Sequence, residues 1–229
     1  MSDKFTVSYV HGDEVSAEFM NSMTKMLLRD ASGDKKINRV IPMRSTVNIS
    51  NARNNVVREF LNSDDDWLLM VDTDMVFRDT LIEDLFKGFK GVEQMPIIGA
   101  LTFSATRNGM VVPHIYYWAP EGTTETLYTA KLYSKNKMIK VGAIGAGCFA
   151  VHRDALAMIF SEHSDDPLPW FNETMYKGVL LGEDLTFCKR AKDIDIPIHV
   201  NTRVKVGHVK PMIISEPMYD RQLKLDSLL

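Results

Sequence analysis

Apolar residues follow two alternating patterns through the first half of the chain. Continuous or alternating apolar runs of strand length occupy 5–10, 37–43, 67–71 and 97–103. Between these runs, apolar residues recur every three or four positions, as they do on one face of a helix. The helical positions are Val15, Phe19, Met23, Met26 and Leu27, then Ala52, Val56, Val57, Phe60 and Leu61, then Leu81, Ile82, Leu85, Phe86 and Phe89. Repeated strand–helix units predict a mostly parallel sheet with helices on both faces.

Two polar residues are expected at the starts of helices: Ser50 before the second and Asp79 before the third. The second half of the chain is less regular. Short antiparallel strands are predicted over 111–118, 126–133 and 138–141, and closing strands over 196–200 and 204–209. Helices are predicted over 154–160 and 184–192, and the tail 213–229 suits a further helix. Because no repeat or low-complexity linker interrupts the chain, we expect one domain over 1–229.

Composition narrows the class of protein. Hydrophobic residues make up 45% and charged residues 25%, which is ordinary for a globular domain. The net charge of −3 gives no overall basic field, so a nucleic-acid partner is not favoured, although a local patch escapes this test. Cys148 and Cys188 are expected to be reduced core thiols. No apolar run approaches the ~18 residues of a membrane span, and no signal peptide is seen, so a cytoplasmic location is expected.

Asp72-Thr73-Asp74 directly follows the buried strand pattern of 67–71. The carboxyl end of such a strand is the edge where open α/β sheets bind ligands. An acidic pair alone is more often a helix cap or a solvated turn. A buried strand that ends on two carboxylates needs compensating positive charge, however, and hard oxygen ligands suit a divalent cation that also holds phosphate oxygens. We therefore interpret Asp72 and Asp74 as a metal site.

Two later segments carry further candidate groups. Gly182-Glu183-Asp184 opens a predicted helix, where one acid suffices as a cap and the other would act as a base or orienting group for an acceptor hydroxyl. His208 follows Gly207 at the end of an apolar strand. A lone histidine there is usually structural, but a neutral imidazole would complete a two-carboxylate site for Mn²⁺ better than for Mg²⁺.

Glycines and an arginine complete the set of candidates. Gly142, Gly145 and Gly147 suit a tight bend, or a backbone surface open to a sugar ring. Arg53 stands in the first turn of a helix, within reach of a phosphate or base, whereas Arg44 is interpreted as a solvated charge. The remaining histidines are interpreted as structural or surface residues, apart from His11 at the end of the first strand; these are His114, His152, His163 and His199.

In this order, the motifs resemble the GT-A type glycosyltransferases, most of all the small family 2-like enzymes of phage and bacterial genomes. The resemblance covers most of residues 5–210. Two of the matching segments, 182–185 and 206–209, are similar to segments of the polypeptide N-acetylgalactosaminyltransferases, in which Gly-Glu-Asn precedes Val-Gly-His. The matching segments lie at 8–12, 51–54, 67–77, 145–151, 182–185 and 206–209.

The resemblance implies a GT-A, Rossmann-like sheet with a small antiparallel subsheet. It divides the chain into a nucleotide-binding half over 5–103, a donor-sugar and acceptor half over 104–210 and a tail over 211–229. It implies Mn²⁺ or Mg²⁺ as cofactor and a nucleoside-diphosphate sugar, with UDP favoured, as donor of a hexose or N-acetylhexosamine. The implied metal ligands are Asp72, Asp74 and His208. The implied nucleotide and donor contacts are Val10, His11, Gly12, Asp13, Arg53, Asp72, Thr73, Gly145, Ala146 and Gly147, and the implied catalytic acids are Glu183 and Asp184.

Several points stay open. Inverting glycosyltransferases use one carboxylate as the base, whereas two adjacent acids, Glu183 and Asp184, compete for that role here. The resemblance to the retaining transferases favours retention of the anomeric configuration. The acceptor is a protein, glycan or small molecule rather than nucleic acid, the oligomeric state is undetermined, and a phage-encoded protein would act in the host cytoplasm. One alternative is a haloacid-dehalogenase-like phosphatase with Asp72 as nucleophile and Asp74 as acid/base. Another is a non-catalytic module that binds sugar nucleotides or glycans.

Overall fold

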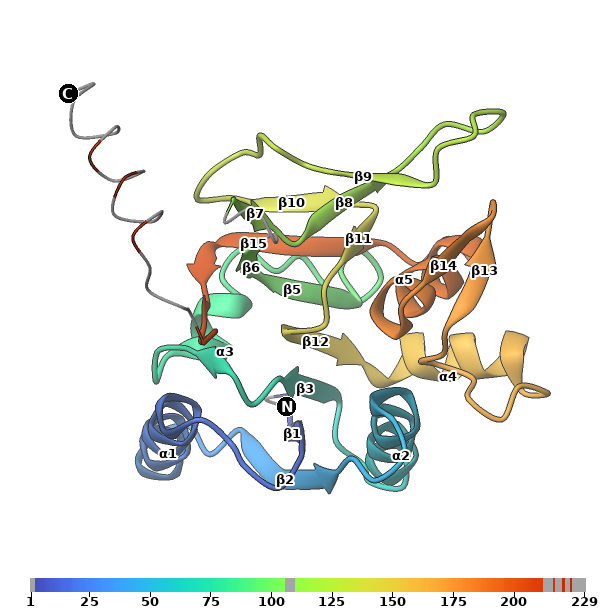
Figure 1. The fold of residues 1–229 in the computed structure, drawn as a ribbon. Coiled ribbons are helices and arrows are strands. Elements are labelled where there is room, and N and C mark those ends of the chain that lie inside the picture. The colour runs from blue at the N-terminus through green and yellow to red at the C-terminus, as the bar shows by residue number, and fades with distance from the viewer. Residues whose placement is uncertain (1–2, 106–109, 212–215, 217–219, 221–222, 224–229) are drawn as a thin grey trace.

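A seven-stranded mixed sheet forms the centre of the protein (Figure 1), in a computed structural model that describes residues 3–105 and 110–211 and, singly, 216, 220 and 223. The strand order is β10-β15-β5-β12-β3-β1-β2, and β12 and β10 run antiparallel to the other five. The mostly parallel sheet predicted from the sequence is therefore confirmed. The strands are β1 (Phe5–His11), β2 (Ile37–Arg44), β3 (Trp67–Val71), β5 (Ile97–Leu101), β10 (Met138–Val141), β12 (Cys148–His152) and β15 (Ile198–Lys205).

Helices cover both faces of this sheet because β3 is apolar on both sides. Leu68 and Met70 pack with three helices on one face, and Leu69 and Val71 pack with two helices on the other. The first group is α2 (Ile49–Leu61), α4 (Arg153–His163) and α5 (Glu183–Asp193), and the second is α1 (Ala17–Ser32) and α3 (Leu81–Leu85). Both cysteines are free and buried, as expected. Within the described ranges, no helix is long and apolar enough to cross a membrane.

Small antiparallel sheets surround the carboxyl edge of the central sheet. One has three strands and three have two, and the pair β16–β4 brings the end of the described chain back onto the turn after β3. They are built from β8 (Ile115–Trp118), β9 (Leu127–Thr129) and β11 (Ala143–Ile144); β6 (Phe103–Ala105) and β7 (Val111–Pro113); β13 (Thr174–Tyr176) and β14 (Val179–Leu181); β4 (Met75–Val76) and β16 (Gly207–His208).

Four local predictions are wrong: the N-cap residues Ser50 and Asp79, the length of α3 and the separation of the two closing strands. The N-cap of α2 is Asn48, whose side chain accepts the Asn51 N–H at 2.8 Å, so Ser50 lies inside the first turn. Helix α3 has Thr80 at its N-cap and ends at Leu85.

The backbone does not continue the helix through Phe86 and Phe89. Their rings pack edge-on against Trp67, with ring centroids 4.7 and 5.6 Å from that of Trp67. The two closing strands are largely one strand, β15, followed by the two-residue β16. The helix expected over 213–229 lies almost wholly outside the described residues.

Candidate active site

Asp72 and Asp74 lie in a tight turn at the carboxyl end of β3. The Asp72 N–H donates to the Gly147 carbonyl at 2.9 Å, and the Asp72 carbonyl accepts the Met75 N–H at 3.1 Å. The Thr73 carbonyl accepts the hydroxyl of Ser16, the N-cap of α1, at 3.0 Å. Because the turn is fixed by β12 on one side and α1 on the other, the two carboxylates are held at the ligand-binding edge of the sheet.

Three consecutive residues from the end of the described chain surround Asp74. Its Oδ2 lies 2.9 Å from His208 Nε2 and 2.7 Å from Lys210 Nζ, and its carbonyl accepts the Val209 N–H at 2.8 Å. Burial alone would raise the pKa of Asp74, but the Lys210 ammonium and the His208 ring outweigh it and hold that pKa below the usual range. The pairing of β16 with β4 thus joins residues 134 positions apart.

The His208 ring has a fixed orientation. Its Nδ1 lies 2.8 Å from the Phe103 carbonyl, which only accepts hydrogen bonds, so Nδ1 carries the hydrogen. At 2.9 Å from the Asp74 carboxylate, which only accepts, Nε2 donates a hydrogen bond when it carries a proton. With a cation in place of that proton, the Nε2 lone pair and the carboxylate would both face the ion, and the Phe103 carbonyl would orient the imidazole from behind. Across 3–105 and 110–211, no three or more His, Cys, Asp or Glu side chains are grouped closely enough to hold a metal ion.

Arg53 connects the acid pair to the start of α5. It is only 2% exposed; one guanidinium nitrogen donates to Asp72 Oδ1 at 2.7 Å and the other to a carboxylate oxygen of Glu183. Burial opposes the charge, yet these two carboxylates raise the pKa of Arg53 above its ordinary value. The guanidinium is therefore bound to two acids of the site, rather than exposed in the way that a phosphate or base contact requires.

The two acids of α5 have different surroundings. Glu183 is paired with Arg53, whereas Asp184 accepts the Leu185 N–H at 2.7 Å. Burial, and then the neighbouring Glu183, raise the pKa of Asp184 above the usual range, although Arg53 and the N–H groups of Leu185 and Ala146 oppose this shift. Asp184 is therefore a carboxylate whose pKa is held above its ordinary value by its surroundings.

The glycine segment 145–147 runs between the acids. Asp184 faces the Ala146 N–H, and the Gly147 carbonyl accepts the Asp72 N–H. A Cβ on Gly145 would lie 2.7 Å from His114 Nδ1, so only glycine allows this approach. Sequence analysis assigned His114 no part in the site, but its ring packs edge-on to His208 with centroids 6.3 Å apart. No sequence motif marks His114, whereas Lys210 stands two positions after His208.

The expected nucleotide edge is formed by the ends of β1 and β2. His11 and Arg44 are register partners, and the His11 carbonyl accepts the Ser45 N–H at 2.8 Å. Arg44, interpreted as a solvated charge, forms an exposed ion pair with Asp13. Val10 and Gly12 flank His11 at the same edge. The structure thus adds Arg44 to the residues expected there.

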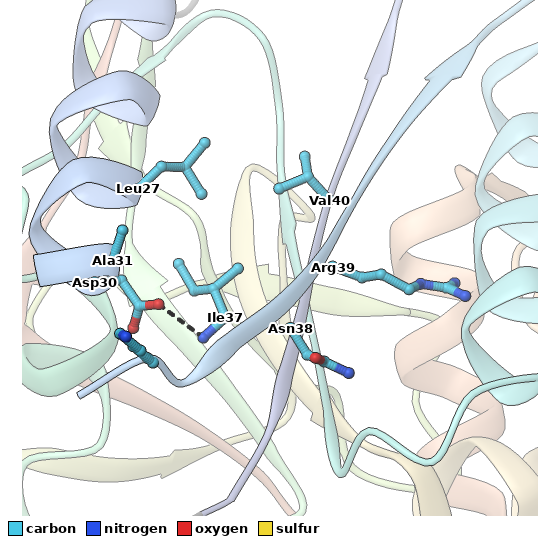
Figure 2. Close-up of a pocket in the computed structure, with 8 residues that line it drawn as sticks. Leu27, Asp30, Ala31, Ile37, Asn38, Arg39 and Val40 are labelled. Carbon is cyan, nitrogen blue, oxygen red and sulfur yellow. Dashed lines mark hydrogen bonds between the residues drawn. The ribbon is translucent and has the colours of Figure 1, made fainter. Parts of the chain in front are cut away.

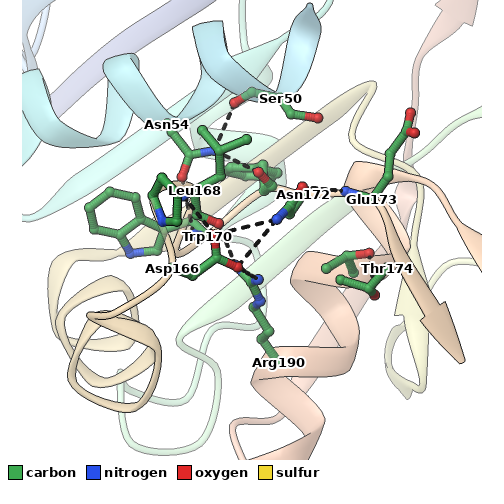
Figure 3. Close-up of polar contacts among 12 residues, drawn as sticks. Ser50, Asn54, Asp166, Leu168, Trp170, Asn172, Glu173, Thr174 and Arg190 are labelled. Atoms are coloured by element: carbon green, nitrogen blue, oxygen red, sulfur yellow. Dashed lines mark hydrogen bonds and ion pairs between the residues drawn. The ribbon is translucent and has the colours of Figure 1, made fainter.

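A polar network supports the helices that carry Arg53 and Glu183 (Figure 3). Asn54 on α2 donates to the Phe171 carbonyl at 2.7 Å and accepts the Trp170 N–H at 3.1 Å. Arg190 on α5 donates to Asp166 at 2.5 Å and to the Leu168 carbonyl at 2.6 Å. Because both helices bind the same loop, their relative position is fixed.

A surface cavity of about 540 Å³ lies elsewhere, between α1 and β2 (Figure 2). Asp30 in this cavity accepts the Ile37 N–H at 3.0 Å, so its carboxylate serves to tie the helix to the strand. None of the residues that line this cavity belongs to the candidate active site.

Neither a protein-family model nor a curated protein matches the sequence. Solved structures share the fold. A197 from STIV matches with a TM-score of 0.59 and 16% identity over 91% of this chain and 86% of that one. GalNAc-T7, solved with UDP, GalNAc and Mn²⁺, matches with a TM-score of 0.60 and 11% identity over 91% of this chain. The match spans 44% of the GalNAc-T7 chain. At these identities the likeness shows the fold, and the GT-A fold expected from the resemblance is confirmed.

Proposed function

We propose that the protein transfers a sugar from a nucleoside-diphosphate donor to a hydroxyl acceptor, with the help of a divalent cation. The observation that carries this proposal is the contact of 2.9 Å between Asp74 Oδ2 and His208 Nε2, two potential metal ligands that are 134 positions apart in the chain. It is supported by the shared fold with GalNAc-T7, whose structure contains UDP and Mn²⁺. The donor we infer is a UDP-hexose or UDP-N-acetylhexosamine.

Asp74 and His208 would be two ligands of a Mn²⁺ or Mg²⁺ ion. Within 3–105 and 110–211 no third His, Cys, Asp or Glu side chain is grouped with them, so Asp72 would become the third ligand by moving the carboxylate oxygen that Arg53 does not engage toward this pair. A bound cation would stabilise the negative charge that develops on the departing diphosphate. The Phe103 carbonyl holds the imidazole in the tautomer that a metal ligand needs.

We assign different roles to the two acids of α5. A general base works best when its pKa lies toward the operating pH, and the pKa of Asp184 is raised in that direction. The carboxylate of Glu183, by contrast, is engaged by the Arg53 guanidinium. Asp184 would accept the proton of the acceptor hydroxyl, and Glu183 would be a positioning residue. A single acting base favours inversion over the retention toward which the sequence resemblance leans. The anomeric configuration of the product decides between them.

The glycine segment is proposed to face the donor sugar. At these glycines a Cβ would meet His114 and Met75, so the bare backbone is what lets the segment pass between Asp72 and Asp184; the sugar would lie beside the segment rather than on the glycines. Val10 to Asp13 would line the nucleoside, with Arg44 beside Asp13. These assignments predict that nucleoside diphosphates bind without an acceptor present.

Calorimetry with UDP tests the proposal. Binding should be tighter with Mn²⁺ than with a chelator, and Asp74→Asn should abolish that difference. Asp34→Asn is the matched control, because Asp34 is an exposed acid paired only with Lys36. Equal UDP affinity with and without Mn²⁺ in the unmodified protein would overturn the metal assignment. Phosphate release from a generic phosphoester would favour the phosphatase alternative, and donor binding without any turnover would favour the binding module.

A further inference from the structure

Eight exposed basic residues lie along and beside the edge of the central sheet formed by β10 and β15, which is opposite α1 and β2 in Figure 1. We call this surface the β10/β15 basic edge. Its members are Lys87, Lys90, Lys131, Lys135, Lys137, Lys140, Arg203 and Lys205. The chain as a whole carries a net charge of −3, so positive charge is concentrated here against an acidic remainder.

Backbone contacts bring these segments together on β15. Asn201 Nδ2 donates to the Lys87 carbonyl at 3.0 Å, and Arg203 donates to the same carbonyl at 3.4 Å. The next residue, Thr202, donates from its hydroxyl to the Lys137 carbonyl at 2.9 Å. The segment after α3 and the segment before β10 are therefore fixed to neighbouring positions of one strand.

Carboxylates do not neutralise this edge. None of the ion pairs between described side chains includes any of the eight residues. Of the acids in the nearby segment 84–93, Asp84 accepts the Thr80 hydroxyl at 2.6 Å, and Glu93 is exposed. Burial lowers the pKa of His199, which pairs with Lys140 across the strands, and the cations of Lys140 and Lys90 lower it further. The local field at this edge is positive.

The same edge carries a protruding apolar side chain. Leu132, next to Lys131, is 93% exposed, and Tyr128 on the preceding strand is 52% exposed. Seven of the eight basic residues are lysines, which act as point charges rather than as forked donors that read bases or phosphates. Lysines around an exposed leucine are typical of surfaces that bind the interface of an anionic bilayer, whereas nucleic-acid surfaces favour arginine and stacked aromatic rings.

We propose that the β10/β15 basic edge docks on an anionic lipid surface, with the lysines at headgroup level and Leu132 among the acyl chains. Each lysine near such a surface strengthens binding roughly five-fold at moderate salt, and the attraction weakens as salt screens it. This inference does not depend on the proposed glycosyl transfer, because it uses none of the residues of the candidate active site.

Co-sedimentation with vesicles tests it. The full chain should bind vesicles that contain about one third phosphatidylserine, but not pure phosphatidylcholine, and should be released by about 0.5 M salt. Lys135→Gln with Lys137→Gln should weaken binding about 25-fold. Leu132→Ser should weaken binding even at low salt, because it removes the inserted apolar group.

The matched control is Lys25→Gln with Lys35→Gln, which removes the same charge from α1 and the turn after it, and should leave binding unchanged. Circular dichroism confirms that each variant is folded. An equal loss of binding in the control pair, or equal binding to both vesicle types, would overturn the proposal. Tighter binding to a short single-stranded oligonucleotide than to the anionic vesicles would also overturn it, in favour of nucleic acid.

Discussion

Arg53 and Glu183 are 130 positions apart in the chain, and their side chains form an ion pair at the buried centre of the candidate site. The same guanidinium donates to Asp72 at 2.7 Å. Removing one partner from a buried ion pair leaves the other charge uncompensated, which costs far more than the pair contributes. Arg53 therefore couples the stability of the fold to the geometry of both groups of acids.

Arg53→Met should lower the free energy of unfolding by about 3–5 kcal/mol, because Asp72 and Glu183 would be left without their buried cation. Arg53→Lys should cost less, since the charge is kept, but one ammonium cannot reproduce the two-sided contact. Urea denaturation of the three proteins measures both differences. A loss below about 1 kcal/mol in the methionine variant would show that the pair is solvated.

Asp184 predicts a pH dependence. Its pKa in the folded protein lies above the ordinary aspartate value of 3.8, so its contribution to stability is fully present below that value and is lost as the pH rises through the folded pKa. As the pH rises from the ordinary aspartate pKa to the folded pKa of Asp184, the free energy of unfolding should therefore fall less for Asp184→Asn than for the unmodified protein. Thermal denaturation between acid and neutral pH checks this, and an unchanged pH profile would refute it.

The same substitution should lower the rate of glycosyl transfer by about 10²–10⁴-fold, the usual contribution of a general base. In the unmodified protein the rate should fall with acidification at a pH above the ordinary aspartate range. Glu183→Gln should lower the rate and keep an acid limb, but move it to lower pH, because Glu183 positions rather than accepts the proton and its charge helps to raise the pKa of Asp184. Steady-state rates across pH separate the two roles, and an acid limb lost only in the Glu183 variant would reverse them.

Lys210 occupies Asp74 Oδ2, an atom that we assign to the cation. Lys210→Met should raise the affinity for Mn²⁺ by up to about five-fold, since a half-exposed ion pair is worth about 0.2–1 kcal/mol. Lys25→Met removes a distant charge and should leave that affinity unchanged. Titration of Mn²⁺ in the absence of nucleotide measures the difference. Weaker Mn²⁺ binding in the Lys210 variant would contradict competition for the carboxylate.

Gly145→Ala tests the close approach at the glycine segment. The new Cβ would meet His114 Nδ1 at 2.7 Å and force the ring to move, with an expected cost of about 1–3 kcal/mol. Gly12→Ala is the control for stability, because nothing lies within 4 Å of its Cβ. Chemical denaturation gives both values. Equal stability of the two variants would show that His114 moves without cost.

The central sheet was predictable because the apolar residues of β3 and its neighbouring strands have the spacing and run length that are typical of buried strands. The length of α3 was not, since Phe86 and Phe89 keep helical spacing while their rings pack on Trp67. The proximity of His208 to Asp74 followed from the order of the family motifs. The pairing of Arg53 with Glu183 and the contact of Lys210 with Asp74 did not, because they join residues 130 and 136 positions apart and leave no local pattern.

The pairing of Gly207–His208 with Met75–Val76 also bears on how the protein is made. A nascent chain that ends before position 207 already contains all seven strands of the central sheet, but lacks the imidazole and the ammonium that surround Asp74. If the proposed cation site is correct, the protein gains it only once residues 207–210 have joined the fold. A shorter chain would carry every strand of the sheet without a site for the ion.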